Sequence, residues 1–220
     1  MDTTIFLVGY MTQLVGSVVL LREIWHKRSI YGLSIDSLAA QFVATAARLV
    51  WSFDTRMKEI LLAHVEVLSS AAVGLALLWS CRQFRHTASF QGVRVRWWLL
   101  VAVCAGAAVR FHPGPVDEWS LQMLIAFTFY LEGVALVPQL LLLRKVNDAD
   151  GLARAYMVLT ILSRAIRILF WGLLYVQGDL FPGLMFADVL QTLMSVRYLH
   201  VWWKYVRSGK GGLIKGHKLI

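Results

Sequence analysis

An acidic residue and a proline interrupt an apolar stretch in the second half of this sequence. The run from Tyr130 to Lys145 is long enough to cross a bilayer, yet it contains Glu132 and the pair Pro138-Gln139. A carboxylate in hydrocarbon is costly and normally faces a bundle interior or a wet cavity. Proline removes a backbone donor, so the carbonyl that it frees needs another partner. Two such costly choices half a helix apart predict a binding site rather than a plain anchor.

Further ionisable residues lie inside apolar stretches. Arg164 and Arg167 are three residues apart, so they share a helix face, and their stretch is expected to lie opposite Glu132. Arginine can hold a carboxylate through two parallel hydrogen bonds, which predicts a polar and charged ligand. The alternative is that the charges form buried salt bridges that only fix helix register. Other charged or polar residues inside the apolar stretches are Arg48, His64, Glu66, Asp188, Gln191, Ser195 and Arg197.

The composition indicates an integral membrane protein of the all-α class. Of the 220 residues, 58% are hydrophobic and 16% are charged, and the mean hydropathy is +0.62. A soluble domain carries about 25% charged residues. The alternation of polar and apolar residues that marks a β-barrel is not evident. At about 20 residues per span, the chain holds roughly seven transmembrane helices and no soluble domain.

The apolar runs place the elements that position these residues. We expect spans over residues 5–24, 38–53, 60–79, 97–109, 119–143, 156–175 and 180–206, forming one bundle over 1–206, with a basic tail at 207–220. The run at 97–109 is the shortest. The first span has no basic region before it, so we interpret it as retained rather than as a cleaved signal.

The basic residues predict the orientation of the bundle. Fifteen lysines and arginines flank the spans on one side, against three on the other. By the positive-inside rule, the N-terminus is lumenal or outside and the C-terminus cytosolic. Topology and anionic membrane lipids therefore account for the net charge of +9, and no nucleic-acid-binding module fits between the spans.

Motifs for enzymes, cofactors and metals are not evident. The sequence lacks a zinc-protease, nucleophile-elbow or P-loop pattern, and Cys81 and Cys104 are not spaced as metal ligands. We expect no cofactor and no metal site. Binding or transport is favoured over catalysis.

Two segments carry a family resemblance. Residues 20–34 read LLREIWHKRSIYGLS, and residues 129–140 read FYLEGVALVPQL. Together with Arg48, Arg164, Trp171 and the pair Gln191-Thr192, they resemble the KDEL receptors, the ER lumen protein-retaining receptors, over essentially the full length. The resemblance implies a PQ-loop/sugar-transporter-like fold, in which two three-helix repeats are joined by a linking helix.

The resemblance also implies a function. Such receptors reside in endoplasmic reticulum and Golgi membranes, bind a C-terminal tetrapeptide of the Lys-Asp-Glu-Leu type in the acidic Golgi and release it in the neutral ER. By position, Arg48 matches the arginine that holds the peptide carboxylate, and Glu132 matches a glutamate of proton-linked closing. Arg164 and Trp171 match positions lining the cavity.

Several cavity positions depart from the family pattern. Phe6 and Gln13 stand where the family has an arginine and a proposed pH-sensing histidine. The other departures are Leu49, Trp51, Gln122, Ser163, Arg167, Phe170 and Leu174. We keep Gln122 and Arg167 among the ligand-binding candidates. With the histidine replaced, His64, Glu66 and Glu132 are the candidate proton sensors. The departures imply an altered tail specificity or a loss of tetrapeptide binding.

The C-terminal tail allows two interpretations. Its cytosolic lysines are Lys204, Lys210, Lys215 and Lys218. The resemblance implies that the coatomer coat reads such lysines, and the alternative is a solvated basic tail that sets topology. For the whole chain, the alternative to a retrieval receptor is a small-solute or proton-coupled transporter on the same fold.

Overall fold

The computed structural model describes residues 2–53, 61–88, 95–112, 121–146 and 154–177, together with residues 185, 186, 189, 192, 193, 196 and 200. The described part is helical and contains no strand. Its helices are α1 (Asp2–Lys27), α2 (Ile35–Ser52), α3 (Leu61–Gln83), the one-turn 3-10 helix η2 (Arg85–Thr87), α4 (Trp97–Phe111), α5 (Leu121–Val134), α6 (Val137–Val146) and α7 (Arg154–Gln177).

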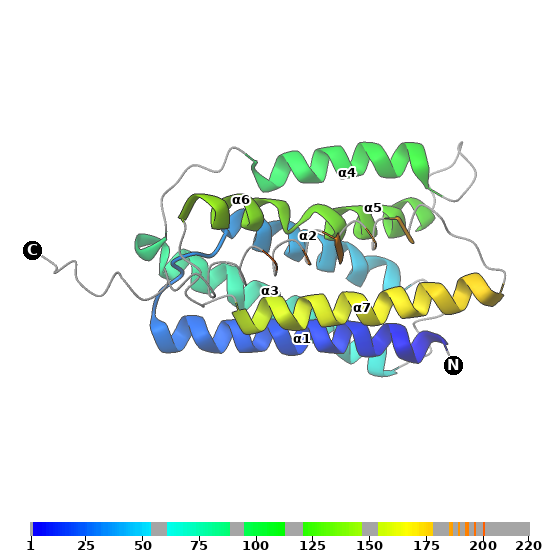
Figure 1. Cartoon of the computed structure of the whole chain (residues 1–220), viewed down its shortest axis with the longest axis horizontal. Coiled ribbons are helices and arrows are strands. Elements are labelled where there is room, and N and C mark those ends of the chain that lie inside the picture. Colours follow the sequence, from blue (N-terminus) through cyan, green and yellow to red (C-terminus); the bar gives the residue numbers. More distant parts are fainter. Residues whose placement is uncertain are drawn as a thin grey trace, which may run out of the picture.

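The long helices form one bundle with alternating directions. α1, α3 and α5 begin at the end of the bundle where α2, α4 and α7 finish (Figure 1). α1 lies along α7, and α2 packs between α3 and α5, while α4 lies outermost against α5 (Figure 1). Within the described part of the chain, the charged residues predicted to lie inside the membrane are buried in this bundle, on α2, α3, α5 and α7.

Glycine lets α1 and α7 approach closely. A Cβ atom at Gly9 would lie 2.8 Å from Cγ of Arg167, and one at Gly16 would lie 3.0 Å from Cβ of Leu159. Both distances are shorter than van der Waals contact. Gly9 and Gly16 are seven residues apart and share one face of α1, so together they form the close seam that small residues make between membrane helices.

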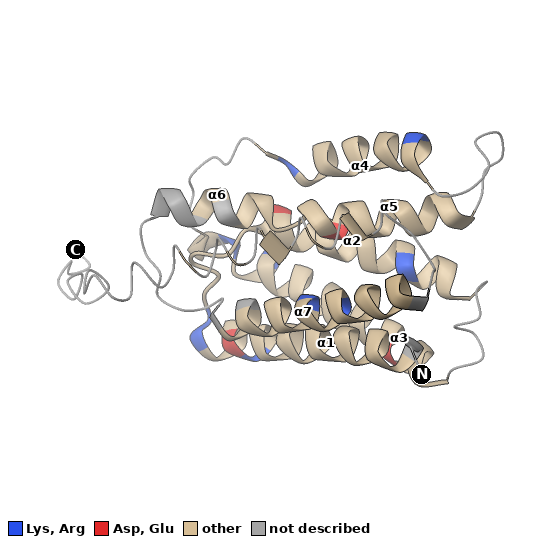
Figure 2. Cartoon of the chain, turned by 45° about the vertical axis from the view of Figure 1, so that its right-hand side comes forward, with Lys and Arg blue, Asp and Glu red and all other residues tan. Residues whose placement is uncertain are grey.

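The distribution of polar and apolar side chains suits a bilayer. Four helical stretches are long and apolar enough to cross a membrane, Thr4–Lys27, Leu61–Gln83, Leu121–Gln139 and Val158–Val176, and α4 is a shorter apolar helix. Large apolar side chains point outward, as at Leu61 with 79% exposure and Trp79 with 72%. The largest fully buried side chains are instead two arginines of α7. Figure 2 shows other basic residues gathered where α1 ends.

The apolar run predicted as one span over 119–143 contains a turn. Ala135 and Leu136 separate α5 from α6, because Pro138 cannot donate the next helical hydrogen bond. The side-chain hydroxyl of Ser37 donates to the Ala135 carbonyl at 2.5 Å and satisfies it. The break thereby ties α5 to the start of α2.

Gln139 completes this connection. Its side-chain Nε2 donates to the Gly32 carbonyl at 2.8 Å, and its Oε1 accepts from the Ser34 backbone amide at 2.7 Å. Gly32 has a φ of +75°, a conformation that favours glycine. The Pro-Gln pair and the turn before α2 are therefore one structural unit.

The other observed helices extend the predicted spans by a few residues. α1, α3 and α7 each begin or end up to four residues beyond the predicted limits, and α4 continues to Phe111. Within the predicted seventh span, 180–206, the described positions are helical. Its remaining residues, with Asp188, Gln191, Ser195 and Arg197, lie outside the part that the structure describes. So does the tail at 207–220.

Candidate functional site

Arg48 lies one turn before the end of α2 and is buried, with 4% exposure. Its Nη2 donates to Oε1 of Glu66 at 2.9 Å, and the same oxygen accepts from Ser70 at 2.6 Å. Glu66 sits in the second turn of α3, so its pairing with Arg48 joins two neighbouring helices near the end where α3 begins. A buried pair of this kind is stable only because each charge has the other.

Tyr10 of α1 lies between two groups of charges. Its ring centre is 3.7 Å from the guanidinium carbon of Arg48 and 4.7 Å from that of Arg167. Its hydroxyl lies 3.5 Å from Oε2 of Glu132. The quadrupole of an aromatic face attracts cations, so this buried ring stabilises both guanidinium groups.

Glu132 is paired with both arginines of α7. Nη1 of Arg164 and Nη1 of Arg167 each donate to Glu132 Oε2 at 2.7 Å. Both arginine side chains are completely buried. The predicted facing of Glu132 and the two arginines is thus observed near the middle of the bundle, where α5 ends at its break.

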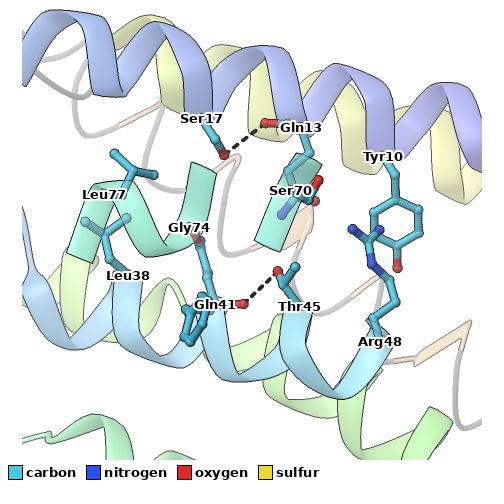
Figure 3. A pocket seen from close by; sticks show the side chains of 11 residues that line it. Tyr10, Gln13, Ser17, Leu38, Gln41, Thr45, Arg48, Ser70, Gly74 and Leu77 are labelled. Atoms are coloured by element: carbon cyan, nitrogen blue, oxygen red, sulfur yellow. Dashed lines mark hydrogen bonds between the residues drawn. The ribbon is translucent and has the colours of Figure 1, made fainter. Parts of the chain in front are cut away.

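A cavity opens beside Arg48 between α1, α2 and α3 (Figure 3). Its lining is mostly polar and includes Tyr10, Gln13, Ser17, Gln41, Phe42, Thr45, Arg48, Ser70 and Gly74, with Leu38 and Leu77 at its far end. The space that water can enter is about 30 Å³. That volume holds water but not a peptide, so a peptide would require the helices to separate.

Several buried polar atoms of this lining lack a hydrogen-bond partner within the described helices. They are Nε and Nη1 of Arg48, Oε1 of Gln13 and Nε2 of Gln41. The amide oxygen of Gln41 accepts from the Tyr156 hydroxyl. Unpaired buried polar atoms are costly, so these groups are suited to a ligand or to water. Most are donors, which favours an anionic or carbonyl-rich ligand.

An aromatic layer fills the region next to the α7 arginines. The ring centre of Phe6 lies 5.0 Å from that of Phe170 and 6.2 Å from that of Phe129. The ring centre of Trp171 lies 5.6 Å from that of Phe129. Trp171, a candidate ligand-binding residue, packs in this cluster and is not among the residues that line the cavity beside Arg48. Gln122 is exposed at the start of α5.

His64 lies near the C-terminal end of α2. Its ring lies 5.5 Å from that of Phe53, and it is not among the cavity-lining residues. The lysines of the predicted coat signal, Lys204, Lys210, Lys215 and Lys218, lie outside the described residues. Within those residues, no group of three histidines, cysteines or acids is placed to hold a metal.

Sequence reasoning missed Tyr10, Ser17, Gln41 and Thr45, which line the cavity together with Arg48 and Gln13. Tyr10, Gln13 and Ser17 are spaced i, i+3, i+7, and Gln41, Thr45 and Arg48 are spaced i, i+4, i+7. Each set lies on one helix face. Polar stripes of this period within apolar helices are the signal that would have found the cavity.

Comparison with known proteins identifies relatives over nearly the whole chain. Residues 29–174 match the family model described as "ER lumen protein retaining receptor". The ER lumen protein-retaining receptor 2 of Homo sapiens is 30% identical over 212 residues, which cover 93% of this chain and 95% of that protein. The ER lumen protein-retaining receptor erd-2.2 of Caenorhabditis elegans is 27% identical over 203 residues, or 91% and 93% of the two chains. The Drosophila melanogaster receptor is 26% identical, covering 92% and 94%.

Proposed function

The chain belongs to the ER lumen protein-retaining receptor family, and we propose from this premise that it binds C-terminal retention tetrapeptides of lumenal proteins through Arg48. The observation that carries the proposal is the state of the Arg48 guanidinium. It is buried, only Nη2 is bonded to a carboxylate, and Nε and Nη1 have no partner within the described helices. A terminal carboxylate is the ligand group that such a guanidinium suits best.

The receptor spans endoplasmic reticulum and Golgi membranes seven times, with two three-helix repeats joined by a linking helix. The end where α1 begins is lumenal and the C-terminus is cytosolic. The basic residues where α1 ends support this orientation, because positive charge marks the cytosolic side. Arg48 and Glu66 then lie in the lumenal part of the bundle, where a lumenal ligand arrives.

Binding in the acidic Golgi and release in the neutral ER complete the cycle. The Glu132 group with Arg164 and Arg167 acts as a latch between α5 and α7 that responds to the occupied cavity. The coatomer coat recognises the cytosolic tail through Lys204, Lys210, Lys215 and Lys218. The receptor names of the relatives support a binding role rather than catalysis.

The test is binding of a Lys-Asp-Glu-Leu peptide to the purified full-length protein at about pH 5.5 and about pH 7.4. A free-acid peptide should bind, and its C-terminal amide should bind at least about tenfold more weakly, because it loses a charged hydrogen-bond partner. Arg48→Lys should weaken binding of the free acid similarly, since lysine keeps the charge but not the planar pair of donors.

Arg110→Lys is the matched control, because Arg110 is exposed near the end of α4. It should leave the affinity unchanged. Binding that ignores both the terminal carboxylate and Arg48→Lys would contradict the proposal.

A transport function is the second candidate, and one observation favours it. The cavity lining continues from Arg48 to Leu38 and Leu77, which lie in the opposite half of the bundle. A polar path through a bundle suits a small anionic solute. Proteoliposomes that accumulate a small carboxylate under an inward proton gradient, and lose this activity with Arg48→Lys, would support transport over retrieval.

A further inference from the structure

Glu66 occupies a position on Arg48 that a ligand carboxylate needs. An arginine binds a carboxylate side by side either through Nε and Nη2 or through Nη1 and Nη2, so Nη2 takes part in both arrangements. Here Nη2 is bonded to Oε1 of Glu66 at 2.9 Å. A ligand carboxylate must therefore share this nitrogen with Glu66 or displace it.

In both cases the ionised form of the buried Glu66 carboxylate becomes unfavourable. Sharing brings two carboxylates to within about 4–6 Å of each other, a distance at which like charges disfavour the doubly ionised state. Displacement leaves the buried Glu66 carboxylate without its arginine, and an uncompensated buried charge is strongly unfavourable. One proton removes the penalty in either case. The neutral carboxyl also keeps a neighbour, since Ser70 Oγ lies 2.6 Å from its Oε1.

Among the described residues, the ionisable groups near Glu66 come from α1, α2 and α3. α2 contributes Arg48, and α1 contributes Tyr10, which covers the guanidinium. On α3 itself, His64 is two residues earlier, and its ring lies against Phe53. Beyond Tyr10 lies Glu132, whose Oε2 is already held by Arg164 and Arg167. Glu66 is thus the carboxylate that contacts Arg48 within the described helices.

We propose that Glu66 is an internal competitor for Arg48 and takes up one proton when a ligand carboxylate binds there. The inference rests on the proposed function and assigns the proton coupling of that site to Glu66. Acid favours binding because it supplies the proton, and neutral pH favours release because ionised Glu66 reclaims the guanidinium. Affinity therefore falls as the pH rises.

The test measures the affinity of the free-acid Lys-Asp-Glu-Leu peptide between about pH 5.5 and about pH 7.5 in the full-length protein. Uptake of one proton per bound peptide predicts a loss of up to about tenfold in affinity for each unit of rising pH. Glu66→Gln should bind with little pH dependence and retain at neutral pH the affinity that the wild type has in acid. His64→Ala is the matched control on the same helix and should keep the wild-type slope.

A second pair of measurements does not depend on the folding of Glu66→Gln. Calorimetric titration of the wild type in two buffers of different ionisation enthalpy should show about one proton taken up per peptide. Ser70→Ala should shift the loss of binding to higher pH, because the ionised carboxylate loses a donor.

The outcomes separate the two proposals. Two results would overturn the role of Glu66 and leave the receptor function standing, provided that peptide binding still depends on Arg48. One is binding without proton uptake, and the other is an unchanged dependence of affinity on pH in Glu66→Gln. A slope lost in His64→Ala would also overturn it. Absence of peptide binding to the wild type throughout this pH range would overturn both.

Discussion

The guanidinium of Arg48 packs on the ring of Tyr10, with 3.7 Å between the guanidinium carbon and the ring centre. Tyr10 is buried, with only 2% of its surface exposed. Its hydroxyl points to Glu132, at 3.5 Å from Oε2. One side chain of α1 therefore touches both the carboxylate site and the charged group between α5 and α7.

The ring and the hydroxyl of Tyr10 can be tested separately. Tyr10→Phe keeps the ring over Arg48 and should leave the affinity for a free-acid peptide nearly unchanged. Tyr10→Leu removes the cation–π contact, worth about 0.5–2 kcal/mol, and should weaken binding by roughly two- to thirtyfold. Peptide titration of both variants measures the difference. Equal losses would show that the hydroxyl, not the ring, supports the site.

The pairing of Glu132 with the α7 arginines could be predicted from sequence, but that of Arg48 with Glu66 could not. Arg164 and Arg167 share a face and must find a negative partner in an apolar bundle, and Glu132 is the acid at their depth. Which residue faces Arg48 depends on the rotation of α2 against α3, and that rotation comes from packing. By position alone, His64 and Glu66 are both candidates to face Arg48. In the structure Glu66 pairs with Arg48, and the ring of His64 lies against that of Phe53.

The break between α5 and α6 was also only partly predictable. Pro138 signals a lost hydrogen bond, but proline can kink a helix without ending it. The polar residues of the run around it, Glu132 and Gln139, do not by themselves indicate a turn. The turn at Ala135 and Leu136 is stabilised by Ser37, which is 98 residues away in sequence. Such a partner becomes visible only in the folded structure.

Glu132 should be the largest single contributor to stability among the carboxylates of the described helices. Glu132→Gln leaves Arg164 and Arg167, both fully buried, without their shared negative charge. Removing one partner of a buried ion pair costs about 3–5 kcal/mol. The thermal unfolding midpoint of the detergent-solubilised protein, followed by tryptophan fluorescence, should fall by several degrees.

Glu23→Gln is the control for this loss. Glu23 pairs with Lys27 at 3.8 Å on the surface of α1, and exposed pairs contribute about 0–1 kcal/mol. Its unfolding midpoint should stay near that of the wild type. A midpoint for Glu132→Gln as high as that for Glu23→Gln would show that the two arginines are satisfied by other groups.

The seam between α1 and α7 should not accept an added methyl group at Gly9. A Cβ there would lie 2.8 Å from Cγ of Arg167 and 3.2 Å from the Ser163 carbonyl oxygen, and a carbonyl cannot move aside cheaply. Gly9→Ala should destabilise the protein by about 1–3 kcal/mol through overpacking. Gly106→Ala is the control, because nothing lies within 4 Å of its Cβ position. That variant should be neutral or up to about 1 kcal/mol more stable, since alanine is the better helix former.

Gln139 should be needed for the turn that joins α1 to α2. Gln139→Leu keeps the approximate volume but removes the donor to the Gly32 carbonyl and the acceptor for the Ser34 amide. Ser34 also caps α2 by accepting from the Ser37 amide at 3.3 Å, so misplacing it would loosen the start of that helix. A buried group left unsatisfied costs about 1–3 kcal/mol, and two such groups are affected.

The thermal midpoint should fall clearly below that of Gln83→Leu, which changes an exposed glutamine at the end of α3. Amide hydrogen exchange should increase at the first turn of α2 in Gln139→Leu alone, and unchanged protection there would show that the turn holds without the glutamine.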